Sequence, residues 1–247
     1  ANMGNGILVS NGTVDIVDGT FIGADSYKNN ADDPMSGAAA SYGFKLYGGE
    51  ITIETGTFGQ STAVGGGAFI MGTSGAPAKA TIKSGTFKVA GTAGGLTLYG
   101  NSNALSIESH TGSSSVKIYG GAFSGGQDGI WYGEAATKLE ILGGTFKADE
   151  DASDSRDARA GLNLDSGASP DVKISGGTFE TDSTDDNAIR ANSDVTYGDI
   201  LEASAVATVT YRSGDPETET GDSTTRVNDT KWVWFRTYHV SKVEVTS

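Results

Sequence analysis

The chain has 247 residues, a formal net charge of −14 at pH 7 and a pI near 4.4. Affinity for nucleic acid comes mainly from clustered Lys and Arg, so this charge balance argues against a nucleic-acid partner. The 37 glycines and 36% hydrophobic content favour short strands joined by tight turns. Cysteine is absent, and no apolar stretch approaches the length of a membrane span, so we expect neither disulfides nor membrane insertion.

One eight-residue phrase recurs six times along the chain, for example as VDIVDGTF at 14–21 and LEILGGTF at 139–146. Its alternating apolar and polar residues predict a strand with one buried face. The glycines that follow predict a corner, after which Phe points back into the core. The closing residues lie 23 to 37 positions apart, which are solenoid periods: Phe21, Phe58, Phe87, Phe123, Phe146 and Phe179.

A second phrase, a small residue followed by apolar-x-apolar, predicts another strand in each coil. We therefore expect two strands and a turn per coil, stacked into an all-β solenoid over residues 1–200. About seven coils, each rising about 4.8 Å, give a rod of roughly 34 Å. The copies of the phrase begin at Gly6, Gly43, Ala68, Gly95, Gly129, Gly161 and Ala188.

The polar positions of the first phrase offer an internal check on this stacking. Read in chain order, the last three alternate in sign, and stacked opposite charges are mildly stabilising. The next polar position places Glu54 beside Lys83. Both patterns favour parallel coils in register. The first column comprises Asp15, Thr52, Thr81, Lys117, Glu140 and Lys173.

From about Leu201 the repeat stops, and residues 201–247 predict two or three further strands. Solenoids expose an apolar end unless something covers it. We therefore interpret this segment as a C-terminal β cap in which Trp232, Trp234 and Phe235 lie over the last coil. A separate small β-domain is the alternative.

Acidic loops follow two neighbouring copies of the repeat, at 149–157 and 182–186. Oxygen ligands in loose geometry suit Ca²⁺, so calcium is an optional ligand of this region. Solvated loops that keep an acidic protein soluble are the alternative interpretation. The candidate metal ligands are Asp149, Asp151, Asp154, Asp182 and Asp185.

Aromatic residues on or just after the strand that begins each coil, formed by the second phrase, are candidates for sugar binding. Flat rings on a rigid β-surface can stack against the CH faces of sugars. We expect Trp131, Tyr132, Tyr99 and Tyr47 to contribute, with Arg190 beside them. The alternative is that these rings cover loops or corners.

A catalytic set is harder to identify. Arg159 and Arg190 lie near the acidic loops, and a polysaccharide lyase would use such an Arg as base while Ca²⁺ neutralises a sugar carboxylate. Ion pairs with nearby Asp residues explain both arginines equally well. We therefore predict a non-enzymatic protein, with the lyase kept as an alternative.

The phrases VKISGGTF at 172–179, LEILGGTF and DGIWYG at 128–133 resemble the coils of large surface proteins of Gram-positive anaerobes. They are also similar to pectate-lyase-like, polysaccharide-binding β-helices, some of which bind calcium. The resemblance covers residues 6–195. It implies a right-handed parallel β-helix, export to the cell surface, and adhesion to a polysaccharide or to host or matrix glycans. We expect a monomeric part of a larger surface protein, and a passive spacer in an adhesin is a further alternative.

Overall fold

The computed structural model describes most of the coil strands and part of the C-terminal segment. The described residues are 4–23, 41–60, 65–73, 75–89, 103–108, 114–133, 137–148, 160–165, 171–182, 186–191, 195, 197–212, 225–227 and 240–247.

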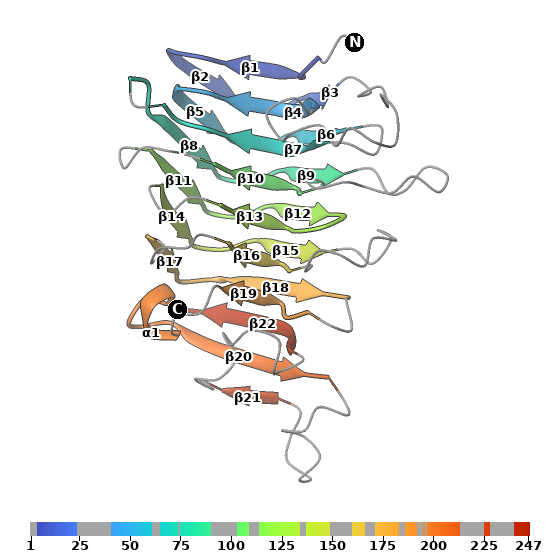
Figure 1. Cartoon of the computed structure of the whole chain (residues 1–247), viewed down its shortest axis with the longest axis vertical. Coiled ribbons are helices and arrows are strands. Elements are labelled where there is room, and N and C mark those ends of the chain that lie inside the picture. The colour runs from blue at the N-terminus through green and yellow to red at the C-terminus, as the bar shows by residue number, and fades with distance from the viewer. Residues whose placement is uncertain are drawn as a thin grey trace, which may run out of the picture.

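Three sheets run along one stack of coils; each of the first six coils contributes one strand to each sheet, and a seventh coil adds a strand to one sheet only (Figure 1). Within the stack every neighbouring pair of strands is parallel, as the sequence predicted for a parallel β-helix. Sheet A contains β1 (Ile7–Val9), β4 (Ser41–Leu46), β7 (Gly65–Ile70), β10 (Leu105–Ile107), β13 (Ile130–Tyr132), β16 (Leu162–Leu164) and β19 (Ile189–Ala191).

The other two sheets take the remaining strands of each coil. Sheet B contains β2 (Thr13–Ile16), β5 (Gly49–Ile53), β8 (Ala78–Ile82), β11 (Ser115–Ile118), β14 (Lys138–Ile141) and β17 (Val172–Ile174). Sheet C contains β3 (Thr20–Gly23), β6 (Thr57–Gln60), β9 (Thr86–Val89), β12 (Ala122–Gly125), β15 (Thr145–Ala148) and β18 (Gly177–Thr181), followed by β22 (Val240–Thr246), β20 (Val206–Tyr211) and β21 (Thr225–Val227).

The structure corrects the number of strands per coil from two to three. The Phe at the end of the repeated phrase starts a strand of its own instead of only closing a corner. In β15, for example, Phe146 and Ala148 are buried while Thr145 is exposed, which is the alternation of a strand. These strands are four or five residues long, so the sequence shows too few alternations to separate them from a turn.

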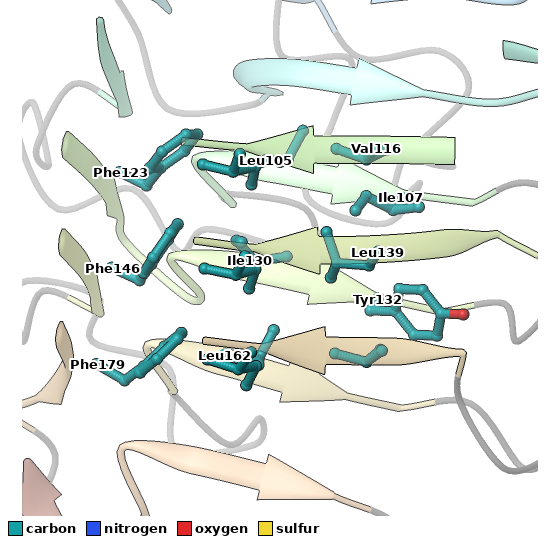
Figure 2. Close-up of a cluster of buried hydrophobic side chains, with 14 of the residues drawn as sticks. Leu105, Ile107, Val116, Phe123, Ile130, Tyr132, Leu139, Phe146, Leu162 and Phe179 are labelled. Carbon is teal, nitrogen blue, oxygen red and sulfur yellow. The ribbon is translucent and has the colours of Figure 1, made fainter. Parts of the chain in front are cut away.

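The core consists of side-chain columns that run along the stack (Figure 2). The six repeat Phe rings pack face to face, with centroids 4.5–5.2 Å apart and planes within 20° of parallel. Stacked aromatic pairs contribute about 0.5–1.5 kcal/mol beyond the area they bury. Aliphatic columns from sheets A and B complete the interior, so the predicted Phe and aliphatic columns are confirmed.

The glycine before each Thr-Phe pair adopts a left-handed backbone at the corner between sheets B and C. Gly85, for example, has φ of 127°, and a Cβ there would lie 3.0 Å from the Gly56 carbonyl oxygen and 3.4 Å from the Phe87 ring. Any larger residue would therefore be strained and would collide with the coil before it. This requirement explains why the phrase keeps glycine at this position.

The predicted register is confirmed in sheet B, where Lys117 pairs with Glu140 and Glu140 with Lys173. In sheet A two expectations were wrong. Leu105–Ile107 occupies the fourth place in the sheet, whereas the sequence pattern had placed a strand after Gly95; residues 90–102 lie outside the described chain. Ala68 pairs with Phe44 instead of Gly43, and this one-residue shift puts Phe69 on the outer face.

At the C-terminal end, β22 pairs antiparallel with β18, and β20 and β21 extend the same sheet. A single helical turn, α1 (Tyr197–Ile200), precedes Leu201, which bridges to Ile174 of the last coil. The buried residues of these elements join the core cluster of the coils, as expected for a β cap. Trp232, Trp234 and Phe235 lie outside the described residues. Within the described chain, no helix is long and apolar enough to cross a membrane.

Candidate functional site

The outer face of sheet A carries the most unusual side chains of the described coils. One outward position per strand is aligned by the parallel register, and neighbours in this column lie about 4.8 Å apart. The column mixes aromatic, amide and cationic groups, whereas an ordinary solvent-facing column would hold small or charged residues. We call it the sheet A column; it contains Leu8, Lys45, Phe69, Ser106, Trp131, Asn163 and Arg190.

The Trp131 ring packs against the backbone at Gly133, directly after its own strand. A Cβ at Gly133 would overlap the Trp131 ring, so the absence of a side chain at 133 is what lets the indole rest on the backbone. The side chain is half-buried and part of it stays accessible to solvent. The connection that leads into this strand runs only from Gly126 to Gly129, between β12 and β13. A large flat ring is thus fixed on the sheet surface beside a short corner.

Two polar side chains continue the column on the C-terminal side of this ring. Asn163 pairs in register with Trp131, and Arg190 pairs with Asn163. Asn163 is 6% exposed and its Nδ2 donates to Asp128 Oδ2 at 3.0 Å. The ring, the amide and the guanidinium therefore form a continuous strip, which we call the Trp131 strip.

Asp128 supports this strip from the corner before β13. The residue is 1% exposed, and its Oδ1 accepts a hydrogen bond from the Ala160 backbone N–H at 2.9 Å. Burial raises the pKa of Asp128 from 3.8 to about 7, even though the bonds from Asn163 and Ala160 and the charge of Arg190 favour the ionised form. A buried carboxyl that titrates near neutral pH is typical of functional sites, although structural networks produce the same effect.

The sequence pattern did not identify Asn163 or Asp128, but a signal for Asp128 exists. An Asn or Asp stands two residues before the sheet A strand in four coils: Asn5, Asn103, Asp128 and Asn187. At both ends of the stack this side chain caps the layer that follows, a coil after Asn5 and the C-terminal strand β22 after Asn187. Asn5 Oδ1 accepts from Tyr42 N at 3.0 Å, and Asn187 Oδ1 accepts from Val240 N at 2.9 Å. Asp128 is the one acidic member of this set.

A second cluster occupies the N-terminal half of the same face, apart from the main core. The Lys45 ammonium lies 4.8 Å from the centre of the Tyr42 ring and 5.3 Å from that of Phe69, and only 3% of Lys45 is exposed. Burial lowers the pKa of Lys45 to about 8, partly offset by the charge of Glu108. Burial likewise raises the pKa of Tyr42. The rings hold a desolvated cation by cation–π attraction.

The structure separates the aromatic residues predicted to bind sugar. Trp131 lies on the outer surface as expected. Tyr132 points into the core, is fully buried, and donates its hydroxyl proton to the Thr137 carbonyl at 2.6 Å (Figure 2). An external ligand therefore cannot reach Tyr132 while the coil is closed. Tyr47 is half-buried and packs edge-on against Phe69, with ring centroids 6.5 Å apart. Tyr99 lies outside the described residues.

The predicted acidic site is mostly outside the described chain. Asp182 is exposed and forms an ion pair with Lys147 at 2.8 Å. Among the residues that the structure describes, no group of three or more potential metal ligands occurs. Calcium binding stays a prediction, and a catalytic role for the arginines stays the alternative to a non-enzymatic protein. The remaining predicted residues fall in undescribed segments: Asp149, Asp151, Asp154, Asp185 and Arg159.

No protein-family model, curated protein or solved structure matches the chain. The stacked parallel coils are shown by the structure itself. The Trp131 strip therefore has to be interpreted from its own chemistry: one flat ring, one amide and one cation, fixed at about 4.8 Å intervals on a rigid sheet.

Proposed function

We propose that the chain is a non-catalytic carbohydrate-binding module that acts outside the cell, and that the Trp131 strip is its binding surface. The observation that carries this proposal is the half-buried indole that packs against Gly133, with Asn163 and Arg190 in register beside it. Aromatic faces stack on the CH faces of pyranoses, and amide and guanidinium groups then bond to the hydroxyls at the rim.

The geometry favours an extended polysaccharide lying along the stack. Successive groups of the strip come from successive coils, so a chain running parallel to the long axis meets the ring, then the amide, then the guanidinium. The strip is part of a stiff hydrogen-bonded sheet, and little conformational entropy is lost when it binds. Sugars whose hydroxyls are all equatorial present the flattest CH faces, so β-linked glucose and N-acetylglucosamine chains are the best first ligands.

The test is retention of the purified protein on insoluble cellulose and chitin and on a glycan array, with Trp131→Ala as the variant. Loss of the ring should abolish most of the retention. Tyr119→Ala is a matched control, because Tyr119 is an aromatic residue that directly follows β11 of sheet B and is 48% exposed. The proposal fails if the native protein is retained on no glycan, or if Trp131→Ala is retained as well as Tyr119→Ala. A rod that binds no glycan would instead favour the spacer function.

A further inference from the structure

The corner residue beneath the Trp131 strip differs from its counterparts in a way that capping does not explain. Asn5 and Asn187 each cap the following layer with one amide oxygen. Asp128 does the same through Oδ1, which accepts from Ala160 N. Neutral Asn would satisfy that bond without the cost of burying a carboxyl. The second oxygen of Asp128 therefore needs a separate explanation.

That second oxygen orients a residue of the strip. Asp128 Oδ2 accepts from Asn163 Nδ2 at 3.0 Å, so the amide nitrogen of Asn163 is turned toward the corner. The Asn163 carbonyl oxygen is the atom of the amide that this bond leaves available, and Asn163 stands in the column between Trp131 and Arg190. A carboxylate can only accept hydrogen bonds, and it therefore enforces this orientation.

Protonation would reverse the arrangement. A neutral Asp128 carries an O–H donor, and with Oδ1 still occupied by Ala160 N–H, that donor faces Asn163. Two donors cannot share one hydrogen bond, so the Asn163 amide would rotate by half a turn and accept from Asp128 through its oxygen. Its NH₂ group would then face the strip.

We propose that Asp128 is a positioning residue that sets which side of the Asn163 amide meets the ligand: an acceptor when Asp128 is ionised and a donor when it is protonated. This inference rests on the proposed function, because it takes the Trp131 strip as the binding surface. The ligand class it specifies is a neutral polysaccharide whose hydroxyl donates to Asn163.

The charged environment places this change in the physiological range. Among the described residues, Arg190 from β19 favours the ionised form of Asp128 and Asp186, between β18 and β19, opposes it, while burial is the largest effect and raises the pKa to about 7. Ionised Asp128 should dominate at pH 8 and protonated Asp128 at pH 5.5. Binding should accordingly be tighter at pH 8.

The first experiment needs no ligand. NMR of the labelled protein follows the Asp128 carboxyl carbon and the Asn163 side-chain amide between pH 5 and 8.5. Both should titrate with one shared midpoint. If Asp128 titrates while the Asn163 amide signal stays unchanged, or if Asp128 is ionised throughout, the inference is wrong even if Trp131-dependent binding is found.

The second experiment measures the affinity of cellohexaose and chitohexaose at pH 5.5 and 8. Native protein should bind about threefold to tenfold more tightly at pH 8, the range expected for one neutral hydrogen bond. Asp128→Asn should bind with the weaker, pH 5.5 affinity at both pH values, because the side-chain amide that this substitution introduces can donate to Asn163 as the protonated acid does. Asn163→Leu should also remove the pH dependence.

Two comparisons separate the possible failures. Every other titratable group of the chain remains in Asp128→Asn, so only the pH dependence that this variant loses belongs to Asp128. A pH dependence retained in Asp128→Asn overturns the inference. Absence of any Trp131-dependent binding at either pH contradicts the proposed function, and the NMR result still decides whether Asp128 controls the amide.

Discussion

The outer faces of sheets A and B belong to the same coils, yet they hold different chemistry. On sheet B many outward side chains are charged and accessible to solvent, and some pair between coils: Lys79 with Glu50 at 2.9 Å and Lys117 with Glu140 at 2.9 Å. Hydrogen bonds from Lys138 and Lys117 lower the pKa of Glu140. On sheet A the equivalent face holds a buried lysine between rings, a tryptophan and a buried amide.

This difference shows which outward side chains the stacking of coils requires and which it does not. Sheet B shows that coils stack in register with threonines and solvent-accessible ion pairs on the outer face, and such pairs are individually weak. Sheet A keeps groups whose burial is unfavourable, including the Lys45 ammonium and the Asp128 carboxyl. Since stacking does not need them, their presence points to a role beyond the fold. We therefore expect the functional surface on sheet A.

The two faces should differ most in how much the free energy of unfolding falls when one aromatic ring is removed from each. Phe69 is fully buried. Its ring centroid lies 5.1 Å from that of Tyr42, and the Lys45 ammonium lies over its ring. Phe69→Ala should lower the free energy of unfolding by about 3–5 kcal/mol, the usual effect of emptying an aromatic site. Tyr119→Ala on sheet B should change it by less than about 1 kcal/mol. Urea denaturation measures both, and equal losses would show that the two faces are equally solvated.

The second contrast is a pH dependence that sheet A should have through Asp128. The native pKa of about 7 exceeds the ordinary 3.8, so between these values the native state holds a proton that the unfolded chain has released. Stability should thus fall as pH rises from about 4 to 7 and change no further above that. Asp128→Asn lacks this penalty and should be more stable than native protein at pH 8, on the order of 4 kcal/mol.

Thermal unfolding of both proteins at pH 4, 5.5, 7 and 8 measures this difference. The stability gap should be smallest at pH 4 and largest at pH 8. A gap that is constant with pH would mean that Asp128 is ionised in both states and that the corner is better solvated than its burial indicates.

The third contrast concerns the contact between the Trp131 ring and the backbone at Gly133. Gly133→Ala should displace the indole, because a Cβ there overlaps the ring. Affinity for cellohexaose or chitohexaose should fall by about 1 kcal/mol, roughly fivefold, with little change in unfolding temperature. Gly75→Ala is the control, since a Cβ at Gly75 meets no atom within 4 Å. Unchanged affinity in Gly133→Ala would show that the position of the Trp131 ring does not matter for glycan binding.

Much of the fold could be predicted because its determinants repeat. The Phe stack and the Lys117–Glu140 pair follow from strict alternation and equal spacing within each phrase. The third strand was missed since it is short, and the register at Ala68 was missed since both Ala68 and Phe69 are apolar, so either fits an inward position. Repetition in the sequence therefore predicts which side chains stack in columns, but it does not predict one-residue shifts in the pairing register of a strand.

The candidate site was predicted only where the residue type is distinctive. Trp131 and Arg190 stand out in a chain with three tryptophans and 17 basic residues. Asn163 and Asp128 do not, because Asn and Asp are common in turns for purely local reasons. Their contact joins positions 35 residues apart, and only the stacking register brings them together.

The smallest expected effect lies on sheet B and tests whether its ion pairs matter at all. Glu50 and Lys79 are both about half exposed, with Lys79 Nζ donating to Glu50 Oε1 at 2.9 Å. A double-mutant cycle with Glu50→Ala and Lys79→Ala should give a coupling of about 0.2–1 kcal/mol, as exposed pairs do. Because the Debye length is about 10 Å at 0.1 M and about 3 Å at 1 M ionic strength, the coupling should shrink in high salt. A coupling above about 2 kcal/mol that persists in 1 M NaCl would mean that sheet B stabilises the stack through its charges, and the contrast with sheet A would lose its basis.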